Sequence, residues 1–134
     1  MMENKISKET AEKQVAALLD YYELEASALN DDLSAALDMS RDKLIRAVMK
    51  GRLEIVEEDG IKITQHTRSG ERLEYSELSG RSKIAMGKKS SGDNYGKIYA
   101  LCGHMTGLGE AGICKLKGLD LSLCEALGSI FLIV

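Results

Sequence analysis

The chain has 134 residues, 44% of them apolar, which is enough to bury one core and too apolar for a chain that is disordered throughout. Proline and tryptophan are absent and aromatic side chains make up only 4%, so aliphatic side chains must dominate the packing. The net charge of −3 divides into −6 over residues 1–60, from 8 basic and 14 acidic side chains, and +3 over residues 61–134, from 10 and 7. Neither half has the strong positive charge that is typical of a nucleic-acid-binding domain.

The start of the chain and its cysteines favour a cytoplasmic location. The first residues lack the apolar core of a secretory signal, and no apolar run reaches the roughly 18 residues that a membrane-spanning helix needs. The three cysteines, Cys102, Cys114 and Cys124, are odd in number and lie in apolar helical stretches. We therefore expect buried, reduced thiols and no contact with a membrane.

Residues 1–51 predict a helical hairpin. Its first helix should run from about residue 8 to residue 25, because apolar side chains recur there at helical spacing and Ser7 can serve as the N-cap. The second helical region begins near Asp31 and ends at Gly51, a residue type that favours the position just after a helix.

A pause within this second region, at Asp38-Met39-Ser40, raises an alternative. Helix 40–50 after a tight turn, followed at once by hairpin 53–65, has the element order of a winged helix-turn-helix protein, whose second helix lies in the major groove of DNA. The basic side chains of that helix would be the DNA-binding residues: Arg41, Lys43, Arg46 and Lys50. Apolar positions within the helix and the acidic tip of the hairpin, Glu57-Glu58-Asp59, count against this alternative.

Residues 52–78 predict a three-stranded antiparallel β-meander. Residues 53–57 and 61–67 alternate apolar and polar side chains, and Asp59-Gly60 between them indicates a two-residue hairpin turn. A second glycine-containing turn leads to a third strand, 73–78. One face of the sheet should pack on helices and the other should meet water.

Residues 79–94 form a basic, Gly/Ser-rich segment that we expect to be a solvated loop, with a short helix in its middle as the alternative. Residues 95–134 predict a C-terminal bundle segment of three helices. The first ends at the Thr-Gly-Leu-Gly break, 106–109, and the last begins after Asp120 or Ser122, either of which could cap it. The predicted fold class is therefore α+β, in one domain.

No motif indicates chemistry. Residues 107–112 match the glycine pattern of dinucleotide-binding loops, but they follow a predicted helix where that pattern needs a strand. His66, His104 and the cysteines lack the spacing of metal ligands. We expect a protein that is not an enzyme, with no catalytic residue, no cofactor and no metal.

The order of motifs over about residues 55–134 resembles the tail assembly chaperones of long-tailed bacteriophages. In that family a β segment precedes a helix that ends in Thr-Gly-Leu, a short helix that ends in Leu, a break that contains Asp, and a final helix that ends in Phe-Leu. The corresponding positions here are Thr106-Gly107-Leu108, Leu116, Asp120 and Phe131-Leu132.

The resemblance implies a non-enzymatic phage or prophage protein of the host bacterial cytoplasm that is absent from the mature virion. Such a chaperone binds the tape-measure protein and helps to recruit tail-tube subunits, and it could form a homo-oligomer. An apolar helical stripe would be the partner-binding surface, and the alternative is that the same stripe packs as core. The residues of this stripe are Leu123, Leu127, Ile130 and Phe131.

Overall fold

The computed structural model of the chain describes residues 5–90 and 92–134, and its fold is α+β with one three-stranded antiparallel sheet. Residues 1–4 and 91, which belong to the predicted segments 1–51 and 79–94, lie outside the described residues. The elements in chain order are α1 (Lys8–Tyr21), the 3-10 helix η1 (Ala26–Ala28), α2 (Asp31–Met49), β1 (Leu53–Glu57), β2 (Ile61–His66), β3 (Arg72–Tyr75), α3 (Gly80–Gly87), α4 (Asn94–Thr106), α5 (Gly109–Ile113) and α6 (Gly118–Ile133).

Helix α1 begins where the sequence predicts and ends earlier. The Ser7 hydroxyl accepts a hydrogen bond from the Thr10 backbone N–H at 3.2 Å, which confirms the predicted cap. The helix ends at Tyr21 rather than at Glu25, because Glu23 takes a left-handed backbone conformation with φ of 55° that a helix cannot contain.

Helix α2 is continuous, so the predicted pause at residues 38–40 is wrong. Asp and Ser favour turns, but this stretch contains no Gly or Pro, and Ser40 is buried within a helical pattern that continues to Val48. The predicted end at Gly51 is confirmed. Gly51 has φ of 75° and donates to the Val48 carbonyl at 3.0 Å, while the N–H of Arg52 bonds the Ala47 carbonyl at 2.9 Å, which is a Schellman motif.

The sheet follows the predicted order β1-β2-β3 and has one buried face. The side chains of this face are Leu53, Ile55, Ile61, Ile63, Gln65, Leu73 and Tyr75. The β1–β2 connection is a three-residue loop rather than a two-residue turn, because Glu57 pairs with Ile61. Asp59 and Gly60 both have positive φ in that loop, at 52° and 110°. The third strand ends at Tyr75, not at residue 78, since the N–H of Ser76 turns to the carbonyl of Met105 in α4 at 2.8 Å.

The segment predicted to be a solvated loop, residues 79–94, contains helix α3 in its first half. The Ser79 hydroxyl accepts from the Ser82 N–H at 3.2 Å and so caps the helix. Ser82 is itself buried, with its hydroxyl 3.2 Å from Nδ1 of His104. The structure therefore shows the alternative, a short helix in this segment.

The C-terminal residues form the three predicted helices, α4, α5 and α6. Gly107 has φ of 78° and ends α4 at the predicted break. Helix α6 begins before its two predicted caps, after Lys117, and without a side-chain capping bond. Asp120 ties this helix to the sheet instead: its carboxylate accepts from the Arg68 N–H at 3.2 and 3.3 Å, and its carbonyl accepts from Nε2 of Gln65 at 2.9 Å.

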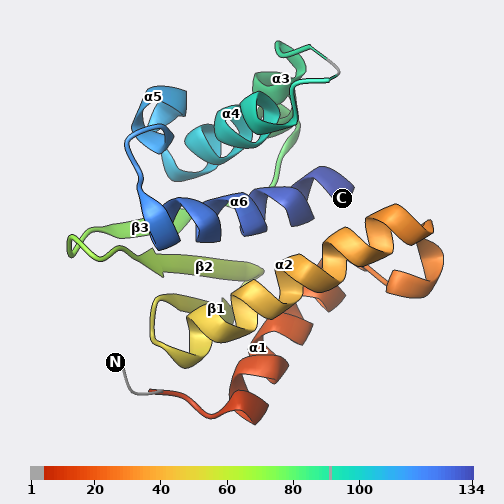
Figure 1. The fold of residues 1–134 in the computed structure, drawn as a ribbon, viewed down its shortest axis with the longest axis vertical. Coiled ribbons are helices and arrows are strands. Elements are labelled where there is room, and N and C mark those ends of the chain that lie inside the picture. Colours follow the sequence, from red (N-terminus) through yellow and green to blue (C-terminus); the bar gives the residue numbers. More distant parts are fainter. Residues whose placement is uncertain (1–4, 91) are drawn as a thin grey trace.

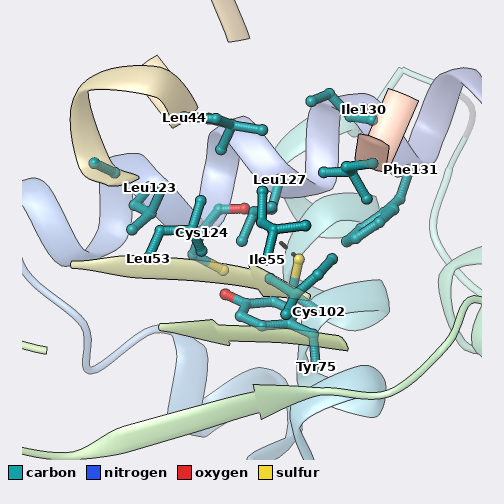
Figure 2. Packing of buried hydrophobic residues seen from close by; sticks show 14 of the residues in the cluster. Leu44, Leu53, Ile55, Tyr75, Cys102, Leu123, Cys124, Leu127, Ile130 and Phe131 are labelled. Carbon is teal, nitrogen blue, oxygen red and sulfur yellow. Dashed lines mark hydrogen bonds between the residues drawn. The ribbon is translucent and has the colours of Figure 1, made fainter. Parts of the chain in front are cut away.

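Helix α6 is the centre of the core. Figure 1 shows it passing between α2 on one side and α4 on the other, over the sheet. Its buried side chains meet those of the sheet and of α4, among them Tyr75 and Cys102 (Figure 2). Gly128 permits the close approach of α4, because a Cβ there would lie 2.5 Å from Cγ2 of Ile98. Within the described residues, no helix is both long enough and apolar enough to cross a membrane.

Candidate functional site

Reactive side chains do not converge anywhere in the part of the chain that the structure describes. No group of three His, Cys, Asp or Glu side chains could hold a metal ion among residues 5–90 and 92–134. His66 lies 3.3 Å from Oε1 of Glu54 in a solvent-exposed pair, whereas His104 belongs to α4 and lies beside Ser82. The glycine pattern of residues 107–112 spans the end of α4 and the start of α5, with no strand before it.

Two of the three cysteines are buried, as predicted, and the third is not. Cys102 and Cys124 lie in the core, where the thiol of Cys102 is 3.7 Å from the Cys124 carbonyl oxygen, whereas Cys114 is exposed. The interaction with Cys124 and burial both raise the pKa of the Cys102 thiol. A raised pKa disfavours the thiolate that a nucleophile or a metal ligand requires. The hydrogen bond with Cys102 lowers the pKa of Cys124, but both side chains are 0% exposed, and on that ground we assign Cys102 and Cys124 to packing.

The stripe predicted on α6 is buried in the folded chain. Leu127 and Ile130 are 0% exposed, Phe131 is 1% exposed and Leu123 is 3% exposed. Of the two alternatives that the sequence leaves open, the structure therefore shows the core. A partner could reach these four side chains only if α6 left the sheet.

The basic side chains of the DNA-binding alternative do not act as one row. Lys43, Arg46 and Lys50 line a pocket of about 280 Å³ between α2 and the start of α6. Arg41 points elsewhere and pairs with Asp38 at 3.5 Å. Because α2 is continuous, residues 40–50 are not a separate recognition helix.

A groove of about 380 Å³ lies between α2, the start of α4 and α6. Met39 of α2 and Tyr95 of α4 stand at its edges, and each is 66% exposed. Ile98 and Ala126 are buried and form its apolar floor. Exposed apolar side chains of this size beside an apolar hollow are typical of a protein-docking surface. We call this feature the α2–α4–α6 groove.

Glu125 fixes the polar wall of the groove. Its Oε2 accepts a hydrogen bond from the Tyr99 hydroxyl at 2.9 Å, and its carbonyl accepts one from the Ser129 hydroxyl at 2.8 Å. Desolvation, and next the hydrogen bond to Glu125, raise the pKa of Tyr99 to about 12 from its usual 10.0. Tyr99 does not itself line the groove, but at physiological pH its neutral hydroxyl donates to Glu125 and so holds that lining residue in place.

The raised pKa of Tyr99 predicts a loss of stability in alkali. A tyrosine whose pKa is higher when folded contributes fully below pH 10.0, and that contribution disappears as the pH rises from 10.0 through about 12. We expect Tyr99→Phe to remove this part of the alkaline destabilisation, as measured by denaturant unfolding at a series of pH values. Glu125→Gln should lower the pKa of Tyr99, as followed by tyrosinate absorbance. An unchanged titration in Glu125→Gln would contradict the assignment.

The sequence did not identify the groove. Met39 falls in the predicted pause at residues 38–40, and Tyr95 stands three residues before Ile98, a helical spacing that favours the core for both. Met39 and Tyr95 are each 66% exposed and line the groove between α2, α4 and α6. The available signal was weak: a methionine and a tyrosine among polar neighbours, Asp38 and Asn94, on two helices.

Comparisons with protein-family models, with curated proteins and with solved structures find no match to this chain. Any inference about its function therefore depends on the geometry of the chain itself.

Proposed function

We propose that the chain is a non-enzymatic tail assembly chaperone of a long-tailed phage or prophage, and that it holds a helical segment of its client in the α2–α4–α6 groove. The observation that carries the proposal is the exposed pair Met39 and Tyr95 beside an apolar hollow. A chaperone for apolar helices needs such a surface, because a client helix inserts apolar side chains at one-turn spacing into a groove.

The residues that carry the family resemblance support this proposal through the fold. The Thr106 hydroxyl donates to the Cys102 carbonyl at 2.8 Å and accepts from the Leu108 N–H at 3.3 Å, so the Thr-Gly-Leu step ends α4. Asp120 binds the sheet and Phe131 is in the core. Because these residues stabilise the fold, we place client binding in the groove and not on the α6 stripe.

A DNA-binding regulator is the weaker alternative. It requires the tight turn that α2 lacks, and it would bring the exposed acidic residues Glu57, Glu58 and Asp59 close to phosphates. The tail-chaperone proposal requires neither feature.

The proposal predicts that Met39→Glu with Tyr95→Glu strongly weakens client binding. Placing two carboxylates at an apolar interface should weaken the complex by about 100-fold or more, since each buried and unpaired charge costs several kcal/mol. The measurement is co-purification of the chain with the tape-measure protein of the same phage after co-expression, followed by titration of the purified pair.

Ile84→Glu is the matched control, because Ile84 is 67% exposed and does not line the groove. It should bind the client as the unmodified chain does. Equal loss in the control and in the double variant would refute the groove as the binding site, and failure of the unmodified chain to bind tape-measure or tail-tube protein would refute the proposed function.

A further inference from the structure

The pocket between α2 and the start of α6, which we call the basic pocket, concentrates positive charge in a hollow of about 280 Å³. Its cationic lining residues are Lys43, Arg46, Lys50 and Arg52. Apart from these, it is lined by Ser122 and by two leucines, of which Leu119 is 43% exposed. Four cations therefore share one small concave site with an apolar wall.

Little negative charge within the described part of the chain offsets three of these cations, Lys43, Arg46 and Arg52. In the described part of the chain, no ion pair involves Lys43, Arg46 or Arg52. Asp120 is near enough to act on Arg52, but its carboxylate already accepts from the Arg68 backbone N–H. Lys50 and Arg52 are partly buried and Lys43 and Arg46 are exposed, and repulsion among four cations around one hollow is relieved when an anion binds between them.

The lowered pKa of Arg52 is consistent with a pocket that favours an anion. The side chain is half-buried, at the start of β1. Desolvation and then the neighbouring Arg68 lower the pKa of its guanidinium, Asp120 opposes them, and Arg46 lowers the pKa further. Arginine remains charged in proteins, so desolvation and repulsion of the Arg52 guanidinium destabilise the folded chain. A carboxylate that forms two hydrogen bonds with the guanidinium is the partner that best offsets this loss.

We propose that the basic pocket binds the carboxylates of an acidic, partly apolar segment of another protein. The apolar wall distinguishes such a segment from nucleic acid, because a phosphate backbone has nothing to bury against the exposed Leu119. Lys43, Arg46 and Lys50 follow one face of α2, but with Arg52 they line a single hollow, and the acidic hairpin tip at residues 57–59 opposes a long polyanion. The inference goes beyond the tail-chaperone proposal, since three of the four cations lie outside the α2–α4–α6 groove.

The test is fluorescence anisotropy with three labelled probes and the purified full chain. The probes are an end-blocked peptide of repeating Glu-Leu-Glu, its all-Glu counterpart and a short DNA duplex. We expect the Glu-Leu-Glu peptide to bind most tightly, and its affinity to fall as salt is added. The variant Arg46→Gln with Arg52→Gln should weaken this binding about tenfold or more, a loss of about 1.4 kcal/mol.

Arg81→Gln with Lys88→Gln is the control, because it removes the same charge from exposed positions on and beside α3. Lys43→Gln, at an exposed position, provides a second variant should the change at Arg52 impair folding. If the control and the pocket variants lost the same affinity for the peptide, net charge alone would explain the binding and the proposal would be overturned. Tighter binding of the duplex would overturn it in favour of nucleic acid, and equal binding of the two peptides would overturn the role of the apolar wall. Binding of the Glu-Leu-Glu peptide without any tape-measure complex would sustain this inference and refute only the proposed function.

Discussion

Phe131→Ala should lower the free energy of unfolding by about 3–5 kcal/mol, the usual cost of deleting a buried aromatic ring. Phe131 is 1% exposed, and its ring meets that of Tyr22 edge to face, with centroids 6.0 Å apart. The Tyr22 hydroxyl in turn accepts from the N–H of Leu78, just after the sheet, at 3.3 Å. One ring thus joins α6 to α1, and the predicted loss is a large part of the roughly 5–15 kcal/mol that stabilises a typical domain.

Denaturant unfolding followed by circular dichroism measures this loss. Leu119→Ala is the control on the same helix, since Leu119 is 43% exposed and should lose less than about 1 kcal/mol. If Phe131→Ala were as stable as that control, Phe131 would not be a core residue, and the assignment of the α6 stripe to the core would be wrong.

Gly103→Ala should also destabilise the chain strongly, by about 1–3 kcal/mol or more. A Cβ at Gly103 in α4 would lie 2.5 Å from the backbone carbon of Gly109 and 2.7 Å from the backbone nitrogen of Glu110. Those atoms belong to the α5 backbone, so they cannot turn aside as a flexible side chain would. The clash should exceed the gain of roughly 1 kcal/mol that alanine brings to a helix over glycine.

Gly87→Ala tests the same change without the clash. Gly87 ends α3, and a Cβ there would meet no atom within 4 Å. Thermal unfolding should show Gly87→Ala unchanged or slightly stabilised, and Gly103→Ala with a clearly lower Tm. A stable Gly103→Ala variant would mean that α5 does not pack on α4 as the structure has it.

The elements of the fold could largely be predicted because their signals are local. The Ser7 cap, the end of α2 at Gly51 and the β-meander depend on side-chain periodicity and on backbone preferences a few residues apart. Two of the errors occurred where tertiary contacts override those preferences. Ser82 is buried against His104 and turns an apparent loop into α3, and Asp120 binds the sheet where a helix cap was predicted.

The candidate site could not be predicted to the same extent, because it depends on which helices lie side by side. The sequence shows an apolar stripe on α6 but not that the sheet, α2 and α4 cover it. It shows basic residues on α2, and only the fold adds Arg52 and the apolar wall of α6 to them. The hydrogen bond from the buried Gln65 side chain to the Asp120 carbonyl, at 2.9 Å, likewise joins residues that are far apart in sequence.

Hydrogen–deuterium exchange of the chain, alone and bound to its tape-measure client, tests most directly whether a client docks in the α2–α4–α6 groove while the α6 stripe stays in the core. We predict that residues 123–131 exchange slowly in both states, and that binding newly protects residues 36–43 of α2 and the first turn of α4. Fast exchange of residues 123–131 in the free chain, with protection only in the complex, would contradict the account and make the stripe the docking surface.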